Sequence, residues 1–276
     1  MSSVHHSTEE VRALYLDLLK RSLANLIYGQ SELKPVVARG VVKRLLIQAC
    51  AARGIQLVRH APFDEAARSD GRDWPATAHT MIGMKRLDNL QHCVEDTLAK
   101  QVPGDFIETG VWRGGASIFM RGILRAHGVS DRLVWVADSF QGLPPPNPDA
   151  YPADAGDPLH TYDYLAVSLE EVKSHFERYG LLDDQVRFLE GWFRDTLPVA
   201  PIERLAVLRL DGDMYESTMD ALGALYPKLS RGGYVIVDDY GAVPACRLAV
   251  HDFRNAHQIT DEIRHIDWTG VFWQRS

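Results

Sequence analysis

The sequence is poor in cysteine, and the cysteines it has are far apart. The three cysteines, Cys50, Cys93 and Cys246, are odd in number, and none has the short spacing of a zinc-ligand pair. This usage predicts neither a disulfide framework nor a zinc site. Free thiols fit a reducing compartment, so we expect a cytoplasmic protein.

The sequence also lacks a leader, a long apolar run and an excess of positive charge. The first residues, MSSVHHSTEE, are polar, with no charged segment ahead of an apolar one, so no secretion signal is predicted. No stretch approaches the roughly 20 apolar residues of a membrane span. The formal net charge of −7 argues against nucleic-acid binding, which needs a basic face. We therefore expect neither a membrane nor a nucleic acid as partner.

Apolar residues are plentiful, at 46% of 276 residues, which is enough for one sizeable domain with an appendage. Residues 9–28 have apolar positions at helical spacing and predict an amphipathic helix. Residues 35–53 predict a second helix that begins at Pro35. We interpret it as a docking helix with a solvated basic face, with a membrane-surface or partner helix as the alternative. Its basic residues are Arg39, Lys43, Arg44 and Arg53.

After Pro103, short apolar and β-branched runs alternate with helical segments. This alternation predicts an α/β fold, with a mostly parallel sheet covered by helices. The last residues form two short runs around Thr269–Gly270 and predict an antiparallel hairpin. The predicted strands are 105–111, 133–140, 186–191, 205–212 and 232–240. One predicted helix begins near Lys85, before these strands, and the others cover about 115–127, 168–180, 216–229 and 244–257.

The first predicted junction between a strand and a helix reads IETGVWRGGAS and contains Gly110. Glycines here let the backbone approach a ligand closely, and the following helix presents free N–H groups. The spacing is G-x-x-x-G-G, so both the dinucleotide fingerprint and the P-loop are missing. Glu108 is expected to point its carboxylate into the crevice, where it would repel phosphate and suit a cationic ligand.

Asp138 ends the next predicted strand, where an acid commonly binds ribose hydroxyls. Together with Glu108 it favours a positively charged nucleoside without pyrophosphate, which describes S-adenosylmethionine. A generic α/β turn with an incidental glutamate is the alternative, and NAD is a weaker rival. The segment EGWFRDTL, with Gly191 and Trp192, follows the third strand, where adenine commonly lies. Ordinary packing at the strand end explains Trp192 equally well.

Acidic residues follow the last two predicted strands, in LRLDGD and VIVDDY. Because ligands gather at the carboxyl ends of parallel strands, we expect Asp211, Asp238 and Asp239 to converge there. Clustered carboxylates repel one another unless a cation or a proton lies among them, and hard oxygen ligands favour Mg²⁺ or Ca²⁺. A bound divalent ion would make an alcohol more acidic, and Asp211 could accept its proton. Surface caps and salt-bridge partners are the alternative.

Several long motifs resemble the macrocin O-methyltransferase family. They are TMIGMKRLDNL, PGDFIETGVWRGGASIFMRG, VWVADSFQGLP, RYGLLDDQVRFLEGWFRDTLP and LRLDGDMYESTMDALGALYPKLSRGGYVIVDDY. The resemblance covers about residues 73–275, whereas the chain looks different from the family before residue 61. It implies a Rossmann-like class I methyltransferase fold. It also implies transfer from S-adenosylmethionine, with Mg²⁺, to a deoxysugar hydroxyl of a glycosylated antibiotic.

The resemblance also assigns roles to residues. It places the metal ion at Asp211, Asp238 and Asp239, with Asp211 as general base, and makes the loop 141–165 a mobile lid. It implies an N-terminal helical cap region at 1–79, a methyltransferase domain at 80–276, and a homodimer or larger homo-oligomer. A catechol-like phenol O-methyltransferase and a non-catalytic S-adenosylmethionine-binding protein are the alternatives. The residues it places around the cofactor are Thr80, Met81, Glu108, Gly110, Ser117, Asp138 and Ser139.

Overall fold

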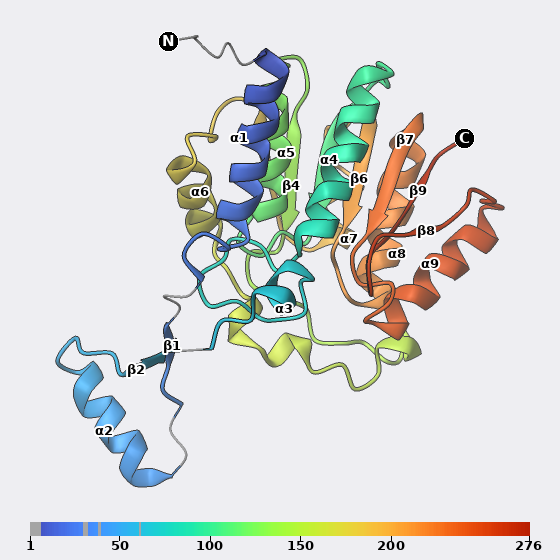
Figure 1. Ribbon diagram of the computed structural model, residues 1–276. Coiled ribbons are helices and arrows are strands. Elements are labelled where there is room, and N and C mark those ends of the chain that lie inside the picture. Colours follow the sequence, from blue (N-terminus) through green and yellow to red (C-terminus); the bar gives the residue numbers. More distant parts are fainter. Residues whose placement is uncertain (1–6, 30–32, 38–39, 61) are drawn as a thin grey trace, which may run out of the picture.

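The computed structural model describes residues 7–29, 33–37, 40–60 and 62–276. Its main feature is a seven-stranded sheet with the order β5-β4-β3-β6-β7-β9-β8 (Figure 1). The first five strands of this order are parallel, and β9 pairs antiparallel with β7 and β8. The predicted parallel sheet and terminal hairpin are therefore confirmed. The strands are β3 Asp105–Thr109, β4 Val134–Asp138, β5 Val186–Glu190, β6 Leu205–Leu210, β7 Leu229–Val237, β8 Arg264–His265 and β9 Val271–Gln274.

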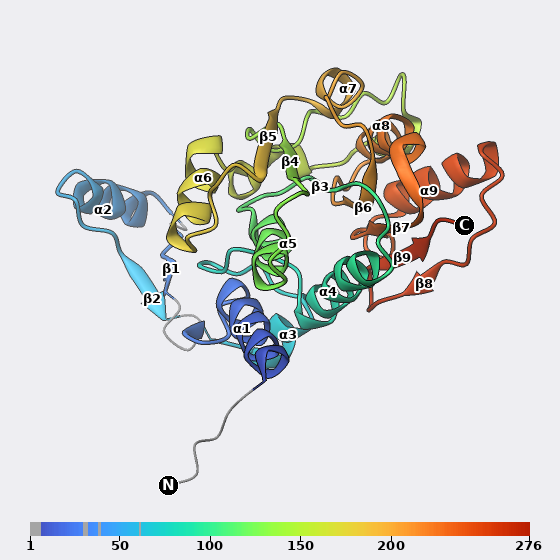
Figure 2. The same ribbon diagram turned by 90° about the horizontal axis from the view of Figure 1, so that it is seen from above.

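Helices cover both faces of the sheet (Figure 2). Successive residues of a strand point to opposite faces, so Phe106 packs in the core under one helical layer and Ile107 in the core under the other. Each predicted helix beyond residue 84 is present within a few residues of its expected limits. The first layer contains α1 Thr8–Leu23, α4 Met84–Ala99, α5 Gly115–Ala126 and α6 Leu169–Arg178, and the second contains α7 Phe193–Thr196, α8 Tyr215–Leu225 and α9 Pro244–Ala256, with the short turn η5 Tyr226–Lys228 after α8.

Helix α1 belongs to the main body although it lies in the predicted cap region. Leu16, Leu19 and Leu23 are buried in the same core cluster as α4 and α5. Ser7 caps the helix and forms a capping box with Glu10, which explains its sharp start. The helix ends at Leu23, five residues before the predicted limit. The boundary between residues 79 and 80 stays a prediction.

We call the segment 33–60 the arm, and its described residues, 33–37 and 40–60, project from the body (Figure 1). The prediction of one helix over 35–53 is wrong at its beginning, because Pro35 ends a short strand. The helix starts only after Gly40, whose φ of +102° favours glycine. None of its described residues is buried, so it does not dock on its own body as we had interpreted. The arm consists of β1 Leu33–Pro35, α2 Val41–Ala51 and β2 Val58–His60, with β1 antiparallel to β2.

The segment between the arm and α4 was predicted as a loop and contains a short helix, α3 Glu65–Ser69. Asp64 caps it by accepting from the Ala67 N–H at 2.9 Å. The predicted lid, 141–165, is built from three 3₁₀ turns, η2 Pro152–Asp154, η3 Leu159–Thr161 and η4 Asp163–Leu165. Within the described residues, every helix is too short or too polar to cross a bilayer.

Candidate active site

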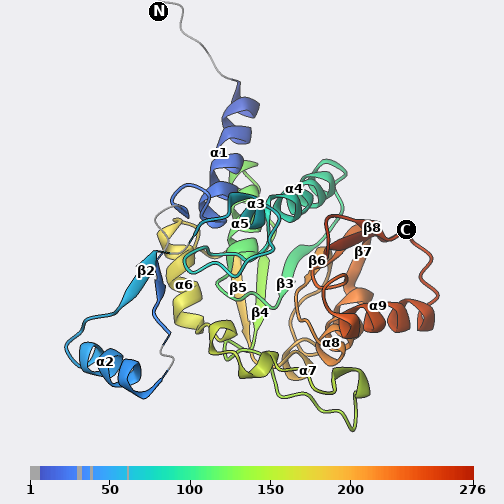
Figure 3. The ribbon, with the colours of Figure 1, turned by 60° about the horizontal axis from the view of Figure 1, so that its bottom comes forward.

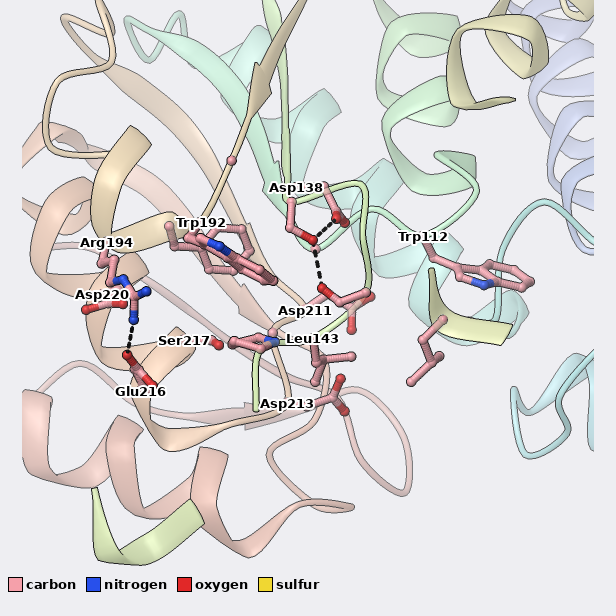
Figure 4. A pocket seen from close by; sticks show the side chains of 18 of the residues that line it. Trp112, Asp138, Leu143, Trp192, Arg194, Asp211, Asp213, Glu216, Ser217 and Asp220 are labelled. Atoms are coloured by element: carbon pink, nitrogen blue, oxygen red, sulfur yellow. Dashed lines mark hydrogen bonds and ion pairs between the residues drawn. The ribbon is translucent and has the colours of Figure 1, made fainter. Parts of the chain in front are cut away.

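A cavity of about 790 Å³, counting its open mouth, lies at the carboxyl ends of the parallel strands. This is the edge where open α/β sheets bind ligands. Figure 4 shows Asp138, Trp192, Asp211 and Asp213 around one common space. The predicted site residues that line it are Met81, Gly110, Asp138, Ser139, Gly191, Trp192 and Asp211. Thr80, Glu108, Ser117, Asp238 and Asp239 lie outside that lining.

The sequence did not single out most of the remaining wall. The lid contributes apolar side chains, and α8 with the segment before it contributes acids. Arg194 donates to Glu216 at 3.2 Å across this part of the wall (Figure 4). The additional lining side chains include Trp112, Leu143, Leu165, Phe193, Arg194, Asp213, Glu216, Ser217 and Asp220.

Asp211, Asp238 and Asp239 converge as the sequence predicts. Each offers one carboxylate oxygen, and these three atoms all lie within 4.8 Å of one another. Asp211 follows β6, while Asp238 and Asp239 follow β7, the neighbouring parallel strand. The donor set is all oxygen, which suits Mg²⁺ or Ca²⁺. The residues present therefore fit a divalent cation, and their ligand role stays a prediction.

Two buried arginines stand among these carboxylates, and the sequence analysis missed both. Arg209, 1% exposed, donates to Glu108 at 2.7 Å, to Asp211 at 2.8 Å and to Asp238 at 2.6 Å. Arg86 pairs with the second oxygen of Asp238 and donates to Asp267 at 3.0 Å. The sequence analysis expected a cation or a proton among the carboxylates and named salt bridges as the alternative; the structure shows that two arginines supply part of the positive charge. A signal was present, because an arginine inside the apolar run LAVLRL must find buried partners.

The cluster nevertheless keeps an excess of negative charge. Burial, together with the charge of Asp238, raises the pKa of Asp211, although Arg209 opposes the shift. Burial and the charges of Asp211 and Asp238 raise the pKa of Asp213 to about 8. The pKa of Asp239 is raised well above its usual value by burial and by Asp213. Raised pKa values of this kind are expected for a cluster of carboxylates whose negative charge two arginines neutralise only in part.

Glu108 is buried beneath the site instead of facing the crevice. One carboxylate oxygen accepts from Arg209, and the other accepts from the hydroxyl of Ser117 on α5. Burial raises its pKa to about 7, against the opposing effect of Arg209. The predicted orientation of Glu108 is thus wrong, because its two partners hold it inside the sheet edge. A contact of Glu108 or Ser117 with a cofactor stays a prediction.

Gly110 is where two strand ends meet most closely. Its φ is +83°, and a Cβ atom built on it would lie 1.6 Å from the carbonyl oxygen of Asp211. A side chain here would push the end of β3 away from the end of β6. The sequence predicted a close approach of the Gly110 backbone to a ligand. The structure shows in addition that this backbone lies close to the end of the neighbouring strand β6.

Asp138 organises the loops on either side of it. Its carboxylate accepts from the Val111 N–H at 2.7 Å and from the Phe140 N–H at 2.8 Å. Burial raises its pKa, and these two N–H groups oppose the shift. Ser139 donates to the carbonyl of Gly142 at 2.7 Å, which shapes the first turn of the lid. Both residues line the cavity, and the predicted ribose contact of Asp138 is untested.

Thr80 and Met81 cover the start of α5. A Cβ atom built on Gly115 would lie 2.7 Å from the Thr80 Cβ, which shows how closely this segment packs on the helix. Met81 lines the cavity, and its carbonyl accepts from Arg68 at 2.5 Å. Arg68 is buried and also donates to the Ile82 carbonyl at 2.9 Å. Sequence reasoning missed Arg68, which holds the covering segment in place.

Comparison with known proteins identifies the family to which this chain belongs. The family model described as Macrocin-O-methyltransferase (TylF) matches residues 12–275. The chain belongs to the macrocin O-methyltransferase family. The resemblance drawn from the sequence motifs is thereby confirmed, and the chain is an O-methyltransferase. Membership in this family also supports S-adenosylmethionine as its cofactor.

Two named relatives and one solved structure match over nearly their whole length. An 8-demethyl-8-(2,3-dimethoxy-alpha-L-rhamnosyl)-tetracenomycin-C 4'-O-methyltransferase from Streptomyces olivaceus is 56% identical, over 98% of this chain and 95% of that protein. A mycinamicin III 3''-O-methyltransferase from Micromonospora griseorubida is 56% identical, over 95% and 96%. The solved structure of the O-methyltransferase NovP superposes with a TM-score of 0.84 at 53% identity, over 96% and 99%.

These matches correct one expectation. The chain was expected to depart from the macrocin O-methyltransferase family before residue 61, and the family match begins at residue 12. Helix α1 and the described parts of the arm therefore belong to the family pattern. The motifs used for recognition all lie beyond residue 79, so nothing in them could reveal this.

Proposed function

We propose that the protein transfers a methyl group from S-adenosylmethionine to a deoxysugar hydroxyl of a glycosylated natural product, with Mg²⁺ held by Asp211, Asp238 and Asp239. The observation that carries this proposal is that one carboxylate oxygen from each of these three residues lies within 4.8 Å of the others, and that Asp211 lines the cavity. The names of two relatives support the acceptor class, because they describe methylation of a rhamnosyl tetracenomycin and of a mycinamicin.

Three groups of residues, in the cavity wall and beside it, would have separate roles in this reaction. Gly110, Asp138, Ser139 and the Gly191–Trp192 turn would bind the cofactor, and Met81 would cover it. Mg²⁺ bound by the carboxylates would make an acceptor hydroxyl more acidic, as bound divalent ions do for water. Leu143 and Leu165 of the lid would exclude water from the reacting atoms.

Asp211 is placed to accept the proton because it belongs both to the carboxylate cluster and to the cavity wall. Arg209 donates to its Oδ2, so the acceptor's proton would go to the other oxygen. The acceptor oxygen would form its bond to the methyl carbon while the carbon–sulfur bond breaks, leaving S-adenosylhomocysteine. Arg209 would hold the aspartate in the orientation that this transfer needs.

A phenol with neighbouring hydroxyls is the second candidate acceptor. Trp112 and Trp192 lie in the cavity wall, and their flat faces suit an aromatic ring. The two candidates are distinguished by incubating the protein with S-adenosylmethionine, Mg²⁺ and either a rhamnosyl glycoside or catechol. Mass spectrometry should detect a methylated glycoside and little methylated catechol. The opposite result would reassign the acceptor class.

The same assay tests the metal ion and the base. EDTA should abolish turnover and Mg²⁺ should restore it; turnover indifferent to both would refute metal dependence.

Asp211→Asn should lower kcat by roughly 10²–10⁴-fold, the usual contribution of a general base. Calorimetric titration should detect nearly unchanged S-adenosylmethionine affinity. Asp184→Asn, at an exposed position away from the cavity, is the matched control, and equal losses in the two variants would remove Asp211 from the base role.

We also propose that the enzyme works in the cytoplasm as a homodimer or larger homo-oligomer. The support is the arm, whose apolar side chains find no cover on their own subunit.

A further inference from the structure

Two exposed aromatic side chains lie next to each other on the main body. Beyond residue 61, where every residue is described, five large apolar side chains are exposed. Trp74 and Tyr162 are two of these five, at 48% and 43% exposed, and their ring centroids lie 5.7 Å apart. Single exposed apolar residues need no explanation, whereas neighbouring ones form a surface on which an apolar ligand can pack.

Tyr164 and Trp112 connect this pair to the inside of the cavity. Tyr164 stacks on Trp74, with ring centroids 5.3 Å apart and an angle of 22° between the ring planes. The ring of Trp112 lies 5.3 Å from that of Tyr164, centroid to centroid, and Trp112 lines the cavity. The four rings therefore form a continuous surface from the cavity wall to the outside of the molecule. We call it the aromatic shelf, and it consists of Trp74, Trp112, Tyr162 and Tyr164.

The aromatic shelf is built from three segments that are far apart in sequence. Trp74 belongs to the segment between α3 and α4, Trp112 to the loop after β3, and the two tyrosines to the end of the lid. Figure 3, in which the bottom of Figure 1 comes forward, shows the segment after α3 and the lid at the same end of the molecule. This is the end at which the parallel strands finish and the cavity lies.

Arg113 holds the three segments together. Its guanidinium lies 4.3 Å from the ring centroid of Trp112 and 5.6 Å from that of Tyr164. It also donates to the carbonyls of Ala76 and Ala78 at 2.9 Å each. The Trp112 indole N–H donates to the Tyr164 carbonyl at 3.0 Å. A surface fixed by these contacts before a ligand arrives loses little conformational freedom on binding, which favours affinity.

The cavity has an aromatic side and a charged side. Figure 4 shows Trp112 on one side of the cavity, and Arg194, Glu216 and Asp220 on the other. An apolar group placed against the charged side would remove water from these ionisable side chains without replacing its hydrogen bonds, which is costly. The side that leads to the aromatic shelf is therefore the one that accepts an apolar part of a ligand.

The size of the cavity indicates which part of a ligand reaches the shelf. A volume of 790 Å³, counting the open mouth, is in the range that holds one drug-sized ligand. The proposed function places S-adenosylmethionine and the reacting sugar there, which leaves no room for the rest of a glycoside. The non-sugar part of the acceptor, the aglycone, then has to lie outside the cavity, and the shelf leads outside from its wall.

We propose that the aromatic shelf binds the aglycone of the glycosylated acceptor, by contact of Trp74 and Tyr162 with a flat apolar face of that group. This inference rests on the proposed function, because it takes a glycoside as the acceptor. Arg113 is a positioning residue, which keeps the shelf aligned with the cavity that holds the reacting sugar. The shelf selects which glycosides bind, whereas the aspartate cluster acts on the sugar hydroxyl.

The first experiment measures binding and does not depend on methyl transfer. The protein, with S-adenosylhomocysteine and Mg²⁺, is titrated in a calorimeter with 2-naphthyl α-L-rhamnoside or with methyl α-L-rhamnoside, which has the same sugar and no ring system. The naphthyl glycoside should bind at least roughly tenfold more tightly, because its rings gain aromatic contacts and bury apolar area. Equal affinities for the two glycosides, or binding of neither, would overturn the proposal.

The second experiment assigns this gain to the shelf. Trp74→Ala should weaken binding of the naphthyl glycoside roughly tenfold and that of the methyl glycoside less than about twofold. Trp74→Phe keeps a ring and should retain most of the affinity. Leu248→Ala, at a 47% exposed position on α9, is the matched control and should bind both glycosides as the wild type does. If Trp74→Ala weakens both glycosides equally, or weakens S-adenosylmethionine, Trp74 only supports the fold and the proposal is wrong.

The same variants, assayed for methyl transfer, separate the shelf from the proposed function. In Trp74→Ala, the ratio of kcat/KM for the naphthyl glycoside to that for the methyl glycoside should fall roughly tenfold, with kcat for the methyl glycoside unchanged. Naphthyl-dependent binding without a methylated product would keep the shelf and refute the proposed function. Methylation of both glycosides, at a ratio that Trp74→Ala leaves unchanged, would keep the proposed function and overturn the shelf.

Discussion

Charged side chains are buried and paired at the edge of the sheet that holds the aspartate cluster, whereas they are exposed in the arm. At the sheet edge, Arg209 and Arg86 are buried and each contacts two or more carboxylates. In the arm, the basic side chains of α2 are exposed, and so are most of its apolar ones. At the sheet edge, both arginines find their carboxylate partners within one chain, and an excess of negative charge remains. In the arm, four apolar side chains stay exposed on the single chain, namely Val41, Val42, Leu45 and Leu46.

The comparison teaches where each region's stability comes from. A buried ion-pair network costs desolvation, and it is tolerated only when every partner is present. Removing one partner leaves uncompensated charge, so substitutions at the sheet edge should affect the fold of one chain. The arm has few internal contacts to lose, so substitutions there should affect association instead. The first two predictions below place a change at the sheet edge beside a matched change in the arm, and the third tests a carboxyl that belongs to neither region.

The largest effect on stability is expected for Arg209→Leu. It leaves Glu108, Asp211 and Asp238 without a shared cation, which should lower the free energy of unfolding by about 3–5 kcal/mol. Arg209→Lys, which keeps one charge and loses the fork of donors, should be intermediate. Arg53→Leu, at an exposed arm position, should change stability by no more than about 0.5 kcal/mol. Urea unfolding of the three variants measures this, and equal losses at Arg209 and Arg53 would break the comparison.

A smaller loss is expected for Gly110→Ala. Its positive φ costs an L-residue roughly 1–2 kcal/mol, and the new Cβ would overlap the Asp211 carbonyl oxygen, adding about 1–3 kcal/mol. Gly54→Ala in the arm is the matched control, because Gly54 has a φ of +70° and no atom within 4 Å of the added Cβ. It isolates the backbone strain from the close approach. Similar unfolding free energies for the two variants would show that the approach of β3 to β6 is unimportant.

The sequence predicted the sheet edge better than the arm, for a physical reason. The strands are apolar runs followed by acidic residues or glycine, and the alternation with helices predicts that they are parallel, which puts their carboxyl ends at one edge. The approach of Asp211 to Asp238 and Asp239 follows because they end two neighbouring parallel strands, β6 and β7. Local pattern misplaced the start of the arm helix, because Pro35 is compatible both with the first turn of a helix and with a short edge strand.

The roles of Arg209 and Arg86 could not be assigned from sequence in the same way. Arg86 is 152 residues from Asp238 in sequence, and only the packing of α4 against the sheet brings the two together. The predicted orientation of Glu108 was wrong for the same reason, because its partners Ser117 and Arg209 come from two different elements. Strand ends are local features, whereas the pairing of buried charges depends on tertiary contacts.

The smallest effect is expected at Asp220, a half-buried carboxyl between the two extremes. Burial and the nearby Glu216 raise its pKa to about 6, against the opposing effect of Arg194. Because the folded-state pKa is above the unfolded value, the folded state binds more protons between those two values. Stability from this group is therefore present at low pH and is lost as the pH rises from about 4 to about 6.

Asp220→Asn removes this dependence, so the variant should gain Tm relative to wild type near pH 7 and show no gain near pH 4. Asp184→Asn, at an exposed position, should leave the difference between the two pH values unchanged. Measuring both Tm differences by calorimetry cancels the contributions of all other titrating groups. A variant that is destabilised near pH 7 would mean that the ionised Asp220 pairs with Arg194 strongly enough to outweigh its burial, which would place it with the paired charges of the sheet edge.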